Sequence, residues 1–262
     1  MNRNLTRIPS YIDPLGSLAF VIVVLLWESL STWGLIDVKF FSSPSAIGST
    51  LYLLLASGKL WPHVYTTLYR SLLAFTLAGV LGILVGLLMA LYRQIDRQLS
   101  VVFGVFYPLP KVALVPILML WLGLGDAPVI TVGAISALYP VLLNMIAGVR
   151  RIDATLVRAA MDLGANYSQI VVKVIIPAST PAILAGLKLA IAQSFITVVA
   201  SEMISFAPGG VGLGWLVTSR GYEGDVSTVF AGLVSLAIVG GSLLLLADRF
   251  EKKLLRWRRE ER

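Results

Sequence analysis

The sequence predicts an all-α membrane protein with about six membrane-spanning helices, and composition gives the first evidence. Hydrophobic residues make up 57% of the 262 residues and charged residues only 13%, and the mean hydropathy is +0.86. A soluble domain carries about a quarter charged residues, which cover its outer surface. Here the apolar residues are expected to face lipid instead, in a single membrane domain over residues 1–262.

Six apolar runs have the length of a membrane crossing, which takes about 20 residues of helix. These runs are 15–35, 66–92, 99–123, 127–149, 178–206 and 226–248. None shows strand-like alternation, and a helix satisfies its own backbone hydrogen bonds in lipid. The first run follows Asp13 and Pro14, an acceptor and a proline that favour a helix start. In the third run, proline removes backbone donors and predicts kinks. Its prolines are Pro108, Pro110 and Pro116.

The distribution of cations predicts that both ends of the chain are cytoplasmic. With the N-terminus inside, fifteen of the 21 Lys and Arg residues fall on inner segments and four on outer segments or helix ends. Lys and Arg accumulate on the cytoplasmic side of membrane proteins. Residues 1–14 are therefore expected to form a cytoplasmic N-terminus and 249–262 a basic cytoplasmic tail. Topology then explains the net charge of +7, and nucleic-acid binding is not expected.

Residue usage argues against catalysis in this chain. Cysteine is absent and His63 is the one histidine, so thiolate chemistry and a metal site are not expected. His63 is expected in a loop. A membrane-embedded enzyme would need clustered catalytic groups, whereas the carboxylates here are scattered. No catalytic residues are predicted.

Two further segments outside the long runs are expected to be structured. Residues 42–58 carry a Ser-Pro start signal and about four turns of helix, so we expect an external amphipathic helix. Residues 207–225 are glycine-rich and are expected to form a flexible outer gate or a re-entrant turn. Gly82 and Gly86 form a G-x-x-x-G pattern, which indicates close helix packing.

The long inner loop, residues 150–176, predicts a short helix after Asp153. Leu156, Ala159, Ala160 and Leu163 recur at helical spacing and would form one small apolar face. This face is suited to entering a groove on another protein.

The same loop carries signals for the end of that helix and the start of another. Arg158 and Asp162 are four residues apart and can pair, and Gly164 lies where a left-handed C′ residue belongs. Asn166 and Gln169 predict a capping box. The second helix is expected to run to Pro177, which would begin or kink the next span. The prediction is two short helices set at an angle at the inner membrane surface.

The loop resembles a motif of bacterial ATP-binding-cassette (ABC) importer permeases: E-A-A, three residues, G, nine residues, I-x-L-P. The matching positions are Arg158, Ala159, Ala160, Gly164, Val174, Ile176 and Pro177. Arg158 reverses the charge of the family's Glu, so a salt bridge from that position cannot be assumed. Residues 108–128, 177–188, VASEMI and GVGLGWL also resemble the sulfonate, taurine, nitrate and bicarbonate permease group.

This resemblance implies the type I importer fold and a division of labour between subunits. Two permease copies, as a homodimer, would form the pathway in a bacterial inner membrane. Two cytoplasmic ATPases would bind ATP and Mg, consistent with the absence of a phosphate-loop motif in this sequence, and an external binding protein would deliver the substrate. The ATPase-coupling residues would be Arg158, Ala159, Ala160, Asp162, Leu163, Gly164, Val174, Ile176 and Pro177.

The implied cargo is a small organic or inorganic anion such as a sulfonate or taurine, with nitrate, bicarbonate or an aromatic, pyrimidine-like compound as the alternative. An ATPase-independent channel or secondary carrier remains a competing class. Such a protein has no need of a coupling loop and often shows inverted repeats.

Polar residues within the spans are candidates for the translocation pathway: Lys111, Lys188, Gln193, Ser194, Thr197, Ser201 and Glu202. The two lysines lie about ten residues from the inner face, roughly 15 Å deep, where they would attract an anion. Snorkelling, or pairing with Glu28 and Glu202, explains them equally well. The polar stripe from Gln193 to Ser201 either lines a pore or hydrogen-bonds a neighbouring helix.

Overall fold

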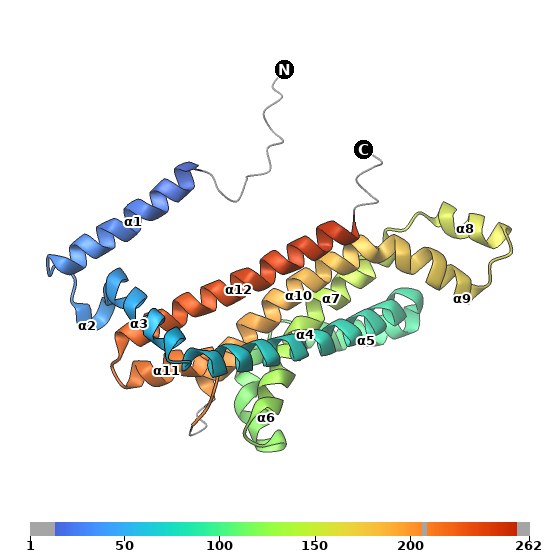
Figure 1. Cartoon of the computed structure of the whole chain (residues 1–262). Coiled ribbons are helices and arrows are strands. Elements are labelled where there is room, and N and C mark those ends of the chain that lie inside the picture. Colours follow the sequence, from blue (N-terminus) through green and yellow to red (C-terminus); the bar gives the residue numbers. More distant parts are fainter. Residues whose placement is uncertain (1–13, 206–208, 256–262) are drawn as a thin grey trace. The chain divides into compact units, whose positions relative to one another are not determined.

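The computed structural model describes residues 14–205 and 209–255, and every regular element in these two ranges is a helix (Figure 1). The all-α prediction is therefore confirmed. The elements are α1 Pro14–Thr32, α2 Val38–Phe41, α3 Pro44–Ala56, α4 Leu60–Leu91, α5 Arg93–Phe106, the 3-10 helix η1 Lys111–Leu114, α6 Val115–Leu122, α7 Asp126–Arg150, α8 Ala154–Asp162, α9 Tyr167–Ile170, the π-helix η2 Val171–Ile175, α10 Ile176–Ile204, α11 Leu213–Tyr222 and α12 Val226–Leu254.

Four helical stretches are long and apolar enough to cross a membrane: Leu60–Leu91, Asp126–Arg150, Tyr167–Ile204 and Val226–Leu254. They match the second, fourth, fifth and sixth predicted runs. The third run forms two helices, Arg93–Phe106 and Lys111–Leu122, bent by 87°. Counting this pair as one crossing gives five among the described residues.

The predicted count of six is thus not reached by length and composition. The first run forms α1, whose apolar part Gly16–Thr32 is shorter than the other spans. The bend in the third run lies where Pro108 and Pro110 remove two backbone donors in three residues. Helical hydrogen bonding therefore stops there and resumes only in η1.

The chain divides into two compact units, which are described separately. One comprises the described residues up to Leu60 together with Val217–Val234, and the other comprises Trp61–Leu216 together with the described residues from Ser235. The expected cytoplasmic ends, 1–14 and 249–262, lie largely outside the described residues, so their placement stays a prediction.

In the first unit, residues 42–58 do contain a helix. The Ser43 hydroxyl accepts a hydrogen bond from the amide of Ala46, and Pro44 occupies the first helical turn, so α3 begins where the Ser-Pro signal predicts. Glu28 of α1 accepts hydrogen bonds from the amide and hydroxyl of Ser45, at 2.9 and 2.8 Å. These bonds tie α1 to the first turn of α3. The external position of α3 remains a prediction.

In the second unit, α7 is the central helix and packs on α4 and α10 through small residues. A Cβ added to Gly82 would lie 2.7 Å from Val141 Cβ, and one added to Gly86 would lie 2.9 Å from Met145 Cβ. On the α10 side, a Cβ on Gly186 would lie 3.0 Å from the Pro140 carbonyl. Helices approach this closely only where side chains are absent, which confirms the predicted packing role of Gly82 and Gly86.

Candidate functional site

Helix α8 begins and ends where local sequence signals place it. Asp153 Oδ1 accepts hydrogen bonds from the Thr155 hydroxyl and amide, at 2.6 and 2.9 Å. These two bonds, the hydroxyl's first, lower the pKa of the Asp153 carboxyl. At the other end Gly164 has φ +83°. The amide of Ala165 donates to the Ala160 carbonyl at 3.0 Å, closing the helix as a left-handed C′ glycine does. Both predicted caps are confirmed.

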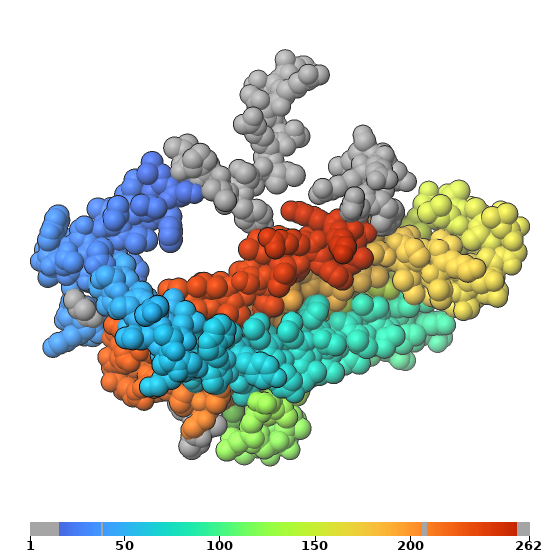
Figure 2. Space-filling view, viewed as in Figure 1, coloured from blue at the N-terminus to red at the C-terminus, as the bar shows by residue number. Residues whose placement is uncertain are grey.

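The predicted apolar face of α8 is left uncovered within the second unit. Leu156 is 55% exposed and Leu163 is 89% exposed, and no residue of α8 is buried. Figure 2 shows this yellow segment at the surface of the view. Arg158 and Asp162 form no ion pair in the described structure, so the predicted pairing is wrong. Contiguous exposed apolar side chains mark interaction surfaces.

The helix after Gly164 begins and ends as predicted. The capping box of Asn166 and Gln169 is present, and α10 begins at Ile176 with Pro177 in its first turn. The helical stretch is continuous across this junction. It runs from Tyr167 to Ile204 through the π-helix η2. The Ile176 amide donates to the Val171 carbonyl, five residues back. This wider turn accommodates a proline that lacks an amide and crowds the preceding turn.

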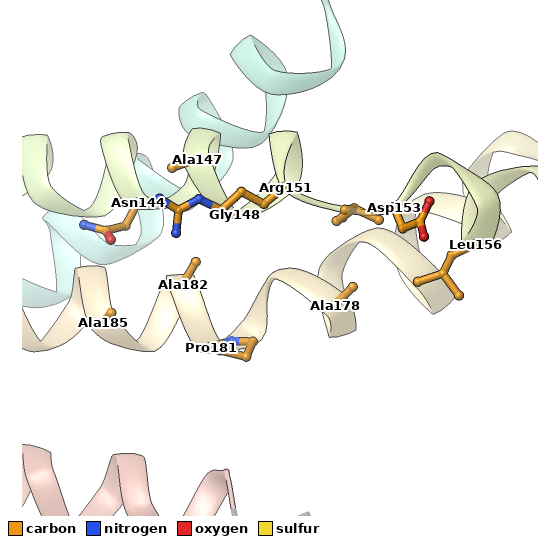
Figure 3. A pocket seen from close by; sticks show the side chains of 11 residues that line it. Asn144, Ala147, Gly148, Arg151, Asp153, Leu156, Ala178, Pro181, Ala182 and Ala185 are labelled. Carbon is orange, nitrogen blue, oxygen red and sulfur yellow. The ribbon is translucent and has the colours of Figure 1, made fainter. Parts of the chain in front are cut away.

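A cavity of about 510 Å³ lies beside α8, between the end of α7 and the first half of α10 (Figure 3). Leu156, from the exposed apolar face of α8, contributes to its lining. The other lining residues are Asn144, Ala147, Gly148, Arg151, Ile152, Asp153, Ala178, Pro181, Ala182 and Ala185.

The two intramembrane lysines have partners that the sequence did not indicate. Lys188 pairs with Asp248 and, at 3.5 Å, with Glu251 of α12. The predicted pairing of Lys188 with Glu28 or Glu202 is therefore wrong. Lys188 contacts the last turns of α12 instead. Asp248 and Glu251 are three residues apart, so one face of α12 presents both.

Lys111 lies at the bend of the third run. Its ammonium donates to the Tyr107 carbonyl and lies 5.1 and 4.8 Å from the ring centroids of Tyr107 and Tyr139. Aromatic faces attract a cation at this distance. The lysine is thereby held locally.

Glu202 is the centre of a buried network that sequence reasoning missed. It is 1% exposed and accepts hydrogen bonds from Thr67 Oγ1, Arg70 Nη1 and the Gly214 amide, at 2.9, 2.9 and 3.0 Å. Arg70 also binds Asp126 at 2.6 Å. A buried carboxylate requires a cation, so the sequence signalled that Glu202 has a partner without saying which residue it is.

This network fixes the turn before α11. Arg70 donates to the Val211 carbonyl at 2.8 Å, and the Leu213 amide donates to Thr67 at 2.8 Å. His63 lies in α4, contrary to the loop prediction, and accepts a hydrogen bond from the Gly212 amide at 3.1 Å. Within the described part of the glycine-rich segment, residues 211–214 are therefore held in place rather than free to move as a flexible gate.

The polar stripe of α10 lies mainly between helices of the second unit. Ser194, Thr197 and Ser201 are buried, and the Ser201 hydroxyl donates to the Thr197 carbonyl at 2.7 Å. Gln193 Nε2 lies 3.4 Å from Ser136 Oγ of α7. The Ser201 bond lies within α10, whereas the Gln193 contact joins α10 to α7. A pathway role for the stripe remains a prediction.

The sequence model of the family described as "Binding-protein-dependent transport system inner membrane component" matches residues 79–258, which is more than half of the chain. The chain belongs to this family. It is 30% identical to the taurine transport system permease protein of Escherichia coli over 251 residues, which cover 94% of this chain and 90% of that protein. It is 32% identical to the riboflavin transport system permease protein of Chloroflexus aurantiacus, covering 90% and 87%.

Solved structures confirm the fold. The permease matches a chain of the MetNI methionine ABC transporter in an inward facing conformation, with a TM-score of 0.66 and 20% identity, covering 75% of this chain and 97% of that chain. The predicted type I importer fold is therefore confirmed. Family and fold together make the protein an integral membrane permease subunit of an ABC importer, whose role is transport rather than catalysis.

Proposed function

We propose that the permease imports a small organic anion of the sulfonate class, such as taurine, across a bacterial inner membrane. The observation that carries this substrate class is the likeness to the taurine permease over 94% of the chain. A second candidate is an aromatic compound, favoured by the 32% identity to a riboflavin permease. Nitrate and bicarbonate remain part of the anion class implied by the resemblance of residues 108–128 and 177–188 to the sulfonate, taurine, nitrate and bicarbonate permease group.

The driving force in this proposal is ATP hydrolysis by two separate cytoplasmic ATPase subunits, which bind ATP and Mg. The exposed face formed by Leu156, Ala159, Ala160 and Leu163 supports this arrangement, because an uncovered apolar helix face suits a groove on a partner. The remaining assembly is a homodimer of permeases with an extracytoplasmic binding protein.

The test is uptake by proteoliposomes that contain the permease and its ATPase, supplied with the binding protein. Radiolabelled taurine and riboflavin are offered in parallel, with ATP and Mg on the ATPase side. We expect taurine to accumulate only when ATP and ATPase are both present. Accumulation of riboflavin alone would transfer the assignment to the second candidate, and uptake without the ATPase would contradict an ATP-driven importer.

A further inference from the structure

The cavity beside α8 has the size and lining of a small-molecule site. Its volume of about 510 Å³ falls within the roughly 300–1,000 Å³ of ligand pockets. Most of its wall is small and apolar, and three polar side chains line it: Asn144, Arg151 and Asp153. Figure 3 shows that residues of α7 and α10 face each other across it.

Arg151 is the cation among the residues that line the cavity. Its guanidinium makes no ion pair in the described structure, whereas Arg150 binds Asp96 at 2.6 Å and Lys188 pairs with Asp248. An exposed guanidinium without a carboxylate partner has its N–H donors available to a solute. Arg151 therefore gives the cavity a positive wall.

Asp153 is the one other charged residue that lines the cavity. The Thr155 hydroxyl and amide are neutral donors that bind its carboxylate without removing the charge. Figure 3 shows this carboxylate directed away from the Arg151 guanidinium, which extends along α7 toward Asn144. Asn144 Nδ2 donates to the Pro140 carbonyl at 2.8 Å, and an amide nitrogen has a second hydrogen to offer.

We propose that Arg151 and Asn144 form an anion site at which the transported anion binds before it leaves the permease. This site deepens the proposed function and rests on it. A sulfonate presents several oxygens to the forked guanidinium, a geometry that favours bidentate binding. Leu156 lines the same cavity, so the bound anion lies beside the helix that would contact the ATPase.

The absence of cysteine from the sequence allows a direct test. Ala182→Cys places one thiol in the cavity of the full permease, assembled with its ATPase in phosphatidylcholine nanodiscs. Modification rates of this thiol are compared for an anionic, sulfonate-bearing and a cationic methanethiosulfonate reagent. We expect the anionic reagent to react about tenfold faster, the lower end of electrostatic focusing in clefts. Methanesulfonate should slow that reaction.

Variants at position 151 test whether the preference for the anionic reagent depends on the positive charge there. In the Ala182→Cys background, Arg151→Gln should abolish the preference, and Arg151→Lys should retain most of it. Ala154→Cys, a thiol on exposed α8 outside the cavity lining, should show little preference and no protection by methanesulfonate. Co-purification of the ATPase verifies that each variant is assembled.

Equal rates at position 182, a preference unchanged by Arg151→Gln, or no protection by methanesulfonate would each overturn the proposal. A preference that disappears when phosphatidylglycerol is added would assign the cavity to lipid headgroups and also overturn it. The labelling rates do not depend on transport. Failure here with intact ATP-driven taurine uptake would leave the proposed function standing, whereas normal labelling without taurine uptake would contradict that function.

Discussion

The region around Glu202 and the region around α8 differ in where their residues find partners. Glu202 is 1% exposed and bound by Thr67, Arg70 and Gly214, so its polar atoms are satisfied inside the chain. In α8 the caps are complete, but Leu163 is 89% exposed. The comparison indicates that the first region stabilises the fold, whereas the second is stabilised by its own caps and keeps its apolar face exposed.

The largest effect is expected from Glu202→Ala. It leaves the Arg70 guanidinium buried with one carboxylate fewer, and breaking a buried pair costs about 3–5 kcal/mol. Thermal unfolding of the purified permease in nanodiscs measures the loss. Glu223→Ala breaks the exposed Arg220–Glu223 pair and should cost about 0–1 kcal/mol. Equal effects of the two variants would contradict a stabilising role for the buried network around Glu202.

Gly214→Ala tests how tightly the turn packs on the network. The added Cβ would lie 2.4 Å from the Val199 carbonyl, a backbone atom that cannot rotate away. Overpacking of this kind costs about 1–3 kcal/mol. The control is Gly241→Ala in α12, where nothing lies within 4 Å and thermal stability should be unchanged or slightly raised. A Gly214→Ala protein as stable as the unmodified permease would show that the backbone of the turn shifts to accommodate the added methyl group.

Ala160→Trp should weaken ATPase binding without lowering thermal stability, the opposite of the first two variants. A large side chain on the apolar face of α8 would clash with the proposed groove of the ATPase and leave the core of the permease unchanged. We expect at least about tenfold weaker ATPase binding, about 1.4 kcal/mol, with unchanged thermal unfolding. Ala154→Trp, exposed but outside that face, serves as the control. Undiminished pull-down of the ATPase by the Ala160→Trp permease would contradict a coupling role for α8.

The smallest effect is expected from Asp153→Ala, which removes the side-chain cap of α8. Amide hydrogen exchange in α8 should become faster, while exchange in α7 and α10 stays unchanged. Hydrogen bonds lower the pKa of Asp153 in the folded protein. The cap therefore stabilises α8 fully when the pH is above the ordinary aspartate pKa, and this stabilisation is lost as the pH falls through the lowered pKa. Exchange that is indifferent to both the substitution and acid would rule out the cap as the local stabiliser.

Sequence reasoning succeeded where the deciding residues are close together in the chain. Asp153 and Gly164 determine the ends of α8 through bonds to residues at most five positions away. The prediction that Pro177 begins or kinks the next span is also confirmed, because α10 begins at Ile176. Local rules did not anticipate the π turn that precedes it. By length and composition the described residues give five crossings rather than six, because the first run forms a shorter apolar helix, Gly16–Thr32. Hydropathy also does not indicate the 87° bend at Tyr107–Pro110.

The sequence by itself determined the membrane class, the positions of the apolar helices and the coupling-loop helix, because composition and short-range hydrogen bonds decide them. Only the tertiary structure decided which charges meet. Arg70 and Glu202 are 132 positions apart, and Lys188 joins Asp248 across α10 and α12. A buried charge must find a partner, but many residues satisfy that rule equally well. Helix packing, through close approaches such as Gly186 against Pro140, selects the one that is within reach.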